Sequence, residues 1–231
     1  MEIREYETAA DGRSPFGEWF EDLDATAAAK VTVALARLEL GNTSNVKSLG
    51  KGVSELKVDF GPGYRIYLGR DGEALIILVV GRHQEAPGPR HRGGAIMLAG
   101  LQEAQERQGL RPLTRSFKET VQARAQADPE FREALLTEGL EAFLSGDLET
   151  GKAIIRDYIN ATIGFDNLAT VTGTPSKSLM RMFGPSGNPN ARNLLTVIGQ
   201  LQKSSGLSIN VGATRKGPIR RKAPARSVVA A

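Results

Sequence analysis

The sequence has no cysteine, one tryptophan and only two histidines among its 231 residues. The absence of cysteine excludes a disulfide framework, a thiolate zinc site and a cysteine nucleophile, and it is typical of the reducing cytoplasm. No apolar run approaches the roughly 18 residues of a membrane span. The first residues, MEIREYETAADG, are too polar and acidic for a signal peptide. We therefore expect a cytoplasmic protein with no membrane partner, long enough for two small domains.

Acidic residues are missing from the segment 214–231, TRKGPIRRKAPARSVVAA, which contains six Lys and Arg. The formal net charge of the whole chain is +4, so this segment carries more than the entire positive excess. Such a composition buries too little apolar surface to fold, and we expect a disordered basic tail. The tail either adds nonspecific affinity for phosphates or is only a solubilising extension.

The first half alternates between strand and helix patterns. Residues 2–7, EIREYE, alternate as in a strand, and Ser14-Pro15 is a typical N-cap with proline at the first helical position. A second helix is predicted over residues 25–40, followed by a loop rich in Gly, Ser and Asn. Three strands separated by tight turns and a final helix are predicted at 53–60, 64–68, 74–80 and 95–108. This order predicts an α+β fold that begins with an antiparallel sheet and packed helices.

Three segments of the first half carry a family resemblance: SPFGEWFEDLD, GVSELKVDFGPGYRIYLGRDG and LIILVVG. Residues 1–81 resemble the HigB branch of the RelE/ParE toxin superfamily. The resemblance implies a small toxin domain, residues 1–108, that cleaves mRNA on the ribosome. Poisoning of DNA gyrase, the activity of the ParE members, fits the HigB-like details less well.

Cleavage of RNA by its own 2′-hydroxyl needs a cation at the phosphate and a group that handles protons. Arg65 in GYRIY matches the strand arginine of the family, and Lys57 in ELK lies near its basic positions. Arg82 and His83 supply a further cation and a titratable group. The resemblance makes these four residues the catalytic candidates. The alternative is that they are ordinary solvent-facing residues.

Residues 82–94, RHQEAPGPRHRGG, depart from the family pattern, in which a segment like Gly-Gly-x-Lys-x-x-Gln follows the last strand. A pair of compensating frameshifts would explain the departure, since GC-rich codons for this stretch can spell a family-like segment in another frame. We therefore expect weak or absent nuclease activity. His83 and His91 have no nearby partners at metal-ligand spacing, so we expect neither a metal nor a cofactor.

The most informative stretch of the second half is residues 165–183, FDNLATVTGTPSKSLMRMF. A helix-turn-helix needs a small residue where its helices touch, a glycine four residues later and an apolar anchor six further on. Ala169, Gly173 and Leu179 have this spacing. Thr174-Pro175 is predicted to cap the second helix, and Asn188-Pro189 the helix after it.

The predicted recognition helix presents polar side chains outward, near its N-terminus. Ser, Thr and Asn bond bases or phosphates, and Arg can read guanine with two hydrogen bonds. The candidate DNA contacts are Thr174, Ser176, Lys177, Ser178, Arg181, Asn188, Asn190 and Arg192. Each taken alone could be a solvated surface residue, but as a group they favour DNA contact.

Residues 111–212 as a whole resemble the HigA-like antitoxins of the Xre/Cro type that accompany these toxins. The resemblance implies a homodimeric repressor that binds its own operator DNA and neutralises the toxin. Helices predicted over 116–127 and after Asp128-Pro129 and Asp147 agree with the all-α character of that family.

The sequence is thus interpreted as a toxin and its antitoxin fused in one chain. The predicted organisation is a toxin domain at 1–108, a linker at 109–113, an antitoxin domain at 114–213 and the tail. Tethering keeps one antitoxin beside each toxin at high effective concentration. One alternative is an active ribosome-dependent RNase that its own C-terminal half inhibits. Another is an interaction module without enzyme activity, whose toxin fold serves as a corepressor on the operator. Whether the halves pair within a chain or between chains remains open at this point.

Overall fold

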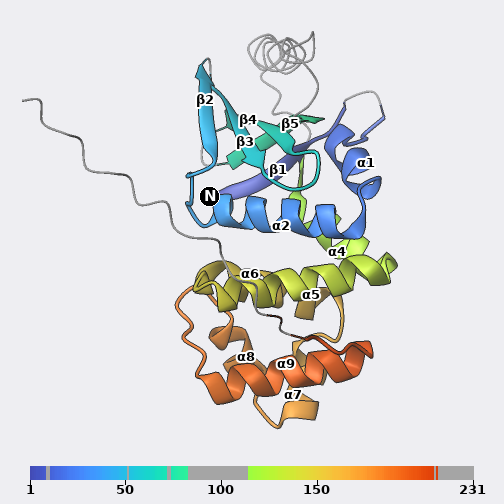
Figure 1. Ribbon diagram of the computed structural model, residues 1–231, viewed down its shortest axis with the longest axis vertical. Coiled ribbons are helices and arrows are strands. Elements are labelled where there is room, and N and C mark those ends of the chain that lie inside the picture. The colour runs from blue at the N-terminus through green and yellow to red at the C-terminus, as the bar shows by residue number, and fades with distance from the viewer. Residues whose placement is uncertain (9–10, 51, 72–73, 83–113, 211, 213–231) are drawn as a thin grey trace, which may run out of the picture.

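The computed structural model describes residues 1–8, 11–50, 52–71, 74–82, 114–210 and 212, and the structural statements below concern these residues. The chain has an α+β fold, with six strands and eight helices in the described ranges. In Figure 1 the sheet is uppermost, α2 lies beneath it, and the helices of the second half lie below α2. The predicted helix 95–108 and the basic tail lie outside the described residues.

The sheet has six strands in the order β2-β3-β4-β5-β1-β6. Their bounds are Glu2–Tyr6 for β1, Val46–Gly50 for β2, Val53–Val58 for β3, Tyr64–Asp71 for β4, Ala74–Arg82 for β5 and Thr114–Ser116 for β6. The sheet is mainly antiparallel, as predicted. However, β1 runs parallel to β5, with Ile3 opposite Leu75, because α1 and α2 carry the chain away before the β2–β5 meander returns it.

Two strands were not predicted from the sequence. β2 lies where we expected a loop, and its residues are mostly exposed, so it lacks the apolar alternation that reveals a strand. It forms an edge of the sheet through its pairing with β3 alone. β6 belongs by sequence to the second half but pairs antiparallel with β1, with Tyr6 opposite Thr114 and Arg4 opposite Ser116. The sheet therefore contains both halves of the chain.

The helices begin largely where local signals place them. Ser14 was predicted as an N-cap, and helices were predicted to follow Asp128 and Asp147; each of the three side chains accepts a hydrogen bond from a backbone N–H of the first turn. The bounds are Pro15–Glu21 for α1, Ala25–Glu39 for α2, Phe117–Ala127 for α4, Pro129–Leu144 for α5, Leu148–Ala161 for α6, Phe165–Thr172 for α7, Ser176–Met182 for α8 and Ala191–Ser205 for α9.

One continuous apolar core joins the residues before 83 to those after 113, called here the first and second halves. Phe20 of α1 is fully buried and meets two rings of the second half edge-on. Its ring centroid lies 5.6 Å from that of Phe117 on α4 and 5.8 Å from that of Phe131 on α5. Such edge-to-face pairs are favourable for buried aromatic rings. The halves therefore pack within one chain.

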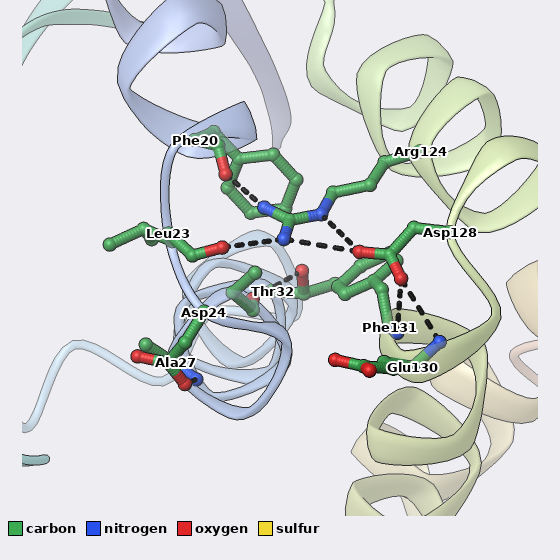
Figure 2. A network of polar contacts seen from close by, with 10 residues as sticks. Phe20, Leu23, Asp24, Ala27, Thr32, Arg124, Asp128, Glu130 and Phe131 are labelled. Carbon is green, nitrogen blue, oxygen red and sulfur yellow. Dashed lines mark hydrogen bonds and ion pairs between the residues drawn. The ribbon is translucent and has the colours of Figure 1, made fainter.

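Arg124 of α4 is the polar centre of this contact (Figure 2). Its guanidinium donates to the backbone carbonyls of Phe20 and Leu23, the latter at 2.6 Å, and to the Asp128 carboxylate at 3.3 Å. The same group lies over the rings of Phe20 and Phe131, 5.3 and 5.0 Å from their centroids. A planar guanidinium suits this site because it stacks on rings while its edge donates hydrogen bonds.

Charged pairs extend the contact along α2. Lys30 Nζ lies 2.7 Å from Glu138 of α5, and Arg37 Nε lies 2.7 Å from Asp147, which caps α6. Burial raises the pKa of Glu138, although its hydrogen bond with Lys30 acts in the opposite direction. Burial also acts to raise the pKa of Asp147, but the hydrogen bond from Arg37 helps to hold that pKa below its ordinary value. Basic side chains of α2 thus face acidic ones of the second half.

Candidate functional site

The α7–α8 pair has the local geometry that its sequence predicts. Gly173 ends α7 with φ of +66°, in the left-handed region that glycine tolerates best. Leu179 of α8 and Phe183 just after it are 1% and 2% exposed, so one side of α8 is anchored in the core. Ala169 packs against the same core. The opposite side of α8 therefore faces solvent.

Two predicted helix caps are wrong by one or two residues. Thr174 makes no capping bond: Pro175 directly precedes α8, and α8 has no side-chain cap. Asn190, rather than Asn188, caps α9 by accepting a hydrogen bond from the backbone N–H of Asn193 at 2.9 Å. Before α9 two asparagines offer the same capping chemistry and the backbone path selects the second, whereas at α8 no side chain caps the helix.

A groove of about 250 Å³ separates α8 from the start of α9. Besides five of the predicted contacts, its lining includes Met182, Gly187 and Asn193, which sequence reasoning did not single out. The predicted residues that the groove brings together are Thr174, Ser178, Arg181, Asn188 and Asn190. The remaining three predicted residues, Ser176, Lys177 and Arg192, are not part of its lining.

The basic side chains around the groove are available to a ligand. Lys177, Arg181 and Arg192 are exposed. Within the described ranges, none of the three takes part in an ion pair with a carboxylate. An exposed cation without an internal partner loses little when it binds an anion. These side chains are therefore free to meet phosphates or base edges.

A buried lysine fixes the loop between α8 and α9. Lys152 of α6 is 3% exposed, and its Nζ donates to the carbonyls of Gly187 at 2.7 Å and Pro185 at 3.3 Å. The Glu149 carboxylate lies 2.8 Å from the same Nζ. A buried ammonium needs such partners. The sequence gives little sign of this role, because the lysine and the loop are more than 30 residues apart.

Gly187 is expected to tolerate no side chain. A Cβ there would lie 2.2 Å from the carbonyl oxygen of Met182 and 2.3 Å from that of Arg181. We expect Gly187→Ala to lower the free energy of unfolding by about 1–3 kcal/mol, as overpacking usually does. Gly199→Ala is the control: a Cβ at this α9 position has no neighbour within 4 Å, so helix propensity predicts stabilisation of up to about 1 kcal/mol. Urea unfolding of both variants measures the difference, and equal midpoints would contradict the close contact.

The catalytic candidates of the first half lie on neighbouring strands, but both cations have internal partners. Lys57 of β3 is opposite Arg65 of β4. Arg65 Nη1 lies 2.5 Å from the buried Glu55 carboxylate, whose hydrogen bond raises the pKa of the guanidinium. Lys57 Nζ lies 2.8 Å from Asp59. Both cations thus have a carboxylate partner in the first half.

The other two candidates are placed only in part. Arg82 is the last residue of β5 and pairs in register with Tyr64, but its side chain lies outside the described ones. His83 and His91 lie outside the described residues. Tyr67, which sequence reasoning did not select, is on the same strand as Arg65, and burial raises its pKa to about 12. A phenol with that pKa stays protonated at neutral pH.

The described part of the chain lacks two further features. It contains no group of three or more His, Cys, Asp or Glu side chains that could hold a metal ion. Nor does it contain a helix with the length and apolar character needed to cross a membrane.

Comparisons with known proteins place this α+β chain in a family. An uncharacterized protein of Haemophilus influenzae is 39% identical over 67 residues, which cover 29% of this chain and 68% of that protein. The chain belongs to the same family as this protein. No protein-family model and no solved structure matches the chain.

Proposed function

We propose that α7 and α8 form a DNA-binding helix-turn-helix in which α8 is the recognition helix. The observation that carries this proposal is the groove between α8 and α9. It gathers five residues chosen from the sequence as DNA contacts, beside basic side chains that have no carboxylate partner in the described structure. An anchored inner face and a polar outer face are what a helix in the major groove requires.

The proposed DNA contacts include residues that can read bases and residues that bind the phosphate backbone. Arg181 can donate two hydrogen bonds to a guanine, and Ser178 can bond a base or a phosphate. Lys177 and Arg192 supply charge to the phosphate backbone. Asn190 uses its side-chain oxygen to cap α9, so only its amide N–H₂ is free for DNA. Operator sequence is then read mainly through Arg181.

We further propose that the chain fuses this repressor and antitoxin unit to an mRNA-interferase-like toxin unit, and that it acts as a homodimeric autorepressor. The Glu55–Arg65 ion pair supports an impaired toxin, because a guanidinium held by a buried carboxylate is less available to RNA. The packing of the two halves within one chain supports permanent pairing of toxin and antitoxin. In this proposal, mRNA and the ribosome are partners of the chain only if its toxin unit is active.

We expect Arg181→Ala to weaken binding of the full chain to the DNA upstream of its own gene by about tenfold to a hundredfold, since a good base contact contributes about 1–3 kcal/mol. Fluorescence anisotropy with that DNA and with a scrambled duplex measures the effect. The loss should be confined to the specific duplex. Arg70→Ala, which changes an exposed residue of β4, is the control and should bind normally. Equal affinity of the wild-type chain for both duplexes would contradict the proposal.

A further inference from the structure

A second cavity, of about 420 Å³, lies between the two halves of the chain. Its wall is formed by the end of α2, the first turns of α4, one side of α6 and the loop that follows α8. Cavities of this size bind small organic molecules. Since four elements from both halves build the wall, the cavity exists only when the halves are packed together.

Two of the three cations in this wall are paired with carboxylates. Lys118 of α4 has its Nζ 3.0 Å from Glu39, at the end of α2. Lys152 of α6 has its Nζ 2.8 Å from Glu149 and also donates to loop carbonyls. These four side chains therefore compensate one another and leave no net charge for a ligand.

The third cation is also engaged, whereas one anion is not. Arg156 of α6 donates to the carbonyl of Met180 at 3.2 Å, and its guanidinium lies 6.0 Å from the centroid of the Phe165 ring. Its neighbour Asp157 lines the same cavity. In the part of the chain that the structure describes, no hydrogen bond or ion pair within 4.0 Å reaches this carboxylate. Among the described residues, Asp157 is thus the carboxylate of the cavity that has no hydrogen-bond or ion-pair partner, whereas Arg156 is held by a carbonyl and a ring although it too has no carboxylate partner.

The remaining wall is suited to an aliphatic chain. Leu40, Ala153, Phe183 and Pro185 supply apolar surface, and Gln122 and Asn160 supply amide groups. The described residues give no set of three metal-ligating side chains here. A single carboxylate with apolar neighbours is a poor site for a bare metal ion but can pair with an ammonium or guanidinium.

We propose that this cavity binds a small aliphatic amine or guanidine, whose cationic group pairs with Asp157. The chain of the ligand lies against the apolar wall, and the bound cation pairs with the Asp157 carboxylate. This site is separate from the groove beside α8, so its occupation does not depend on the DNA-binding proposal.

The electrostatics of Asp157 set the pH range of binding. Burial is the largest effect and raises the pKa of this carboxyl to about 6. Lys118 of α4 and Arg156 of α6 act against that rise, and Glu39 of α2 adds to it. A cation binds the ionised form, so binding is complete above about pH 7 and weakens as the pH falls through 6.

Isothermal titration calorimetry of the full chain with putrescine, a four-carbon diamine, tests the proposal. 1,4-Butanediol is the matched probe, with the same carbon chain and no charge. We expect putrescine to bind at pH 8 and the diol not to bind. At pH 5 only about a tenth of a carboxyl with a pKa near 6 is ionised, so the affinity should fall about tenfold.

Asp157→Asn keeps the shape of the side chain and removes its charge, and we expect at least about a tenfold loss of putrescine affinity at pH 8. Glu133→Gln, which removes an exposed charge of α5, should bind as the wild type does. Absence of heat with putrescine at pH 8 would overturn the proposal. So would equal binding of the diol, or affinity that neither Asp157→Asn nor acid pH reduces. The pH series on the wild-type chain keeps the test decisive even if the variant folds poorly.

Discussion

Arg124→Ala is expected to lower the free energy of unfolding by about 3–5 kcal/mol, the usual cost of breaking a buried charge pair. The substitution removes a side chain that is 4% exposed and donates to two backbone carbonyls and one carboxylate. Its loss leaves the carbonyls of Phe20 and Leu23 without that donor inside the contact between the halves. Urea unfolding followed by far-UV circular dichroism measures the change.

The Arg124 side chain also contacts aromatic rings. Its removal is therefore expected to lower the free energy of unfolding by more than the loss of its hydrogen bonds alone. The guanidinium lies against both Phe20 of α1 and Phe131 of α5, and both rings would border the space it leaves (Figure 2). Asp128, which caps α5, would also lose its cation partner. Arg124→Lys is expected to recover only part of the stability that Arg124→Ala loses, because an ammonium does not have the planar set of N–H donors with which the guanidinium reaches several acceptors at once.

Arg13→Ala is the control for this pair of variants. Arg13 also pairs with carboxylates, but its side chain is 70% exposed. Surface ion pairs contribute about 0–1 kcal/mol, so this variant should unfold close to the wild type. If Arg124→Ala cost no more than Arg13→Ala, Arg124 would not hold the two halves together.

Asp157→Asn is expected to stabilise the folded chain, and to do so increasingly as the pH rises from 4 to 7. The pKa of Asp157 is raised from an ordinary value of 3.8 to about 6 by burial. Between these two pH values the folded state binds more protons than the unfolded state. The free energy of unfolding of the wild-type chain therefore falls as the pH rises. Above the folded pKa the cost is constant, and we expect a gain of about 1–3 kcal/mol at pH 8.

Unfolding free energies of the variant and the wild type, measured in urea at pH 4, 5, 6, 7 and 8, check this sign. The difference should be near zero at pH 4 and level off above pH 7. Glu133→Gln, with its exposed carboxylate, should show no such trend. A difference that stays flat across the series, or that shrinks with rising pH, would mean that Asp157 is not desolvated in the folded chain.

The elements predicted correctly depend on signals within one or two helical turns. Ser14, Asp128 and Asp147 cap their helices because a short polar side chain can reach a backbone N–H two or three residues on. Gly173 takes the left-handed conformation that the spacing around it required. The cap of α9 was placed wrongly because Asn188 and Asn190 have the same chemistry and the backbone path chose between them, whereas α8 begins after Pro175 with no side-chain cap at all.

The elements missed depend on partners far along the chain. β2 is exposed and has no alternation, so only its pairing with β3 makes it a strand. β6 joins β1 from more than 100 residues away, and Arg124 meets Phe20 across a similar separation. Alternation along a strand also cannot tell whether its neighbour is parallel, as β5 is to β1.

By itself, then, the sequence determined the helices of the described residues, most of the strands, the turn before α8 and the polar character of its outer face. Each of these follows from residues that are close together in the chain. Only the tertiary structure decided that the halves share one core, that Glu55 engages Arg65, that Lys152 holds the loop after α8 and that Asp157 has no partner among the described residues. Burial and charge pairing depend on which surfaces meet, and that is set by packing between distant segments.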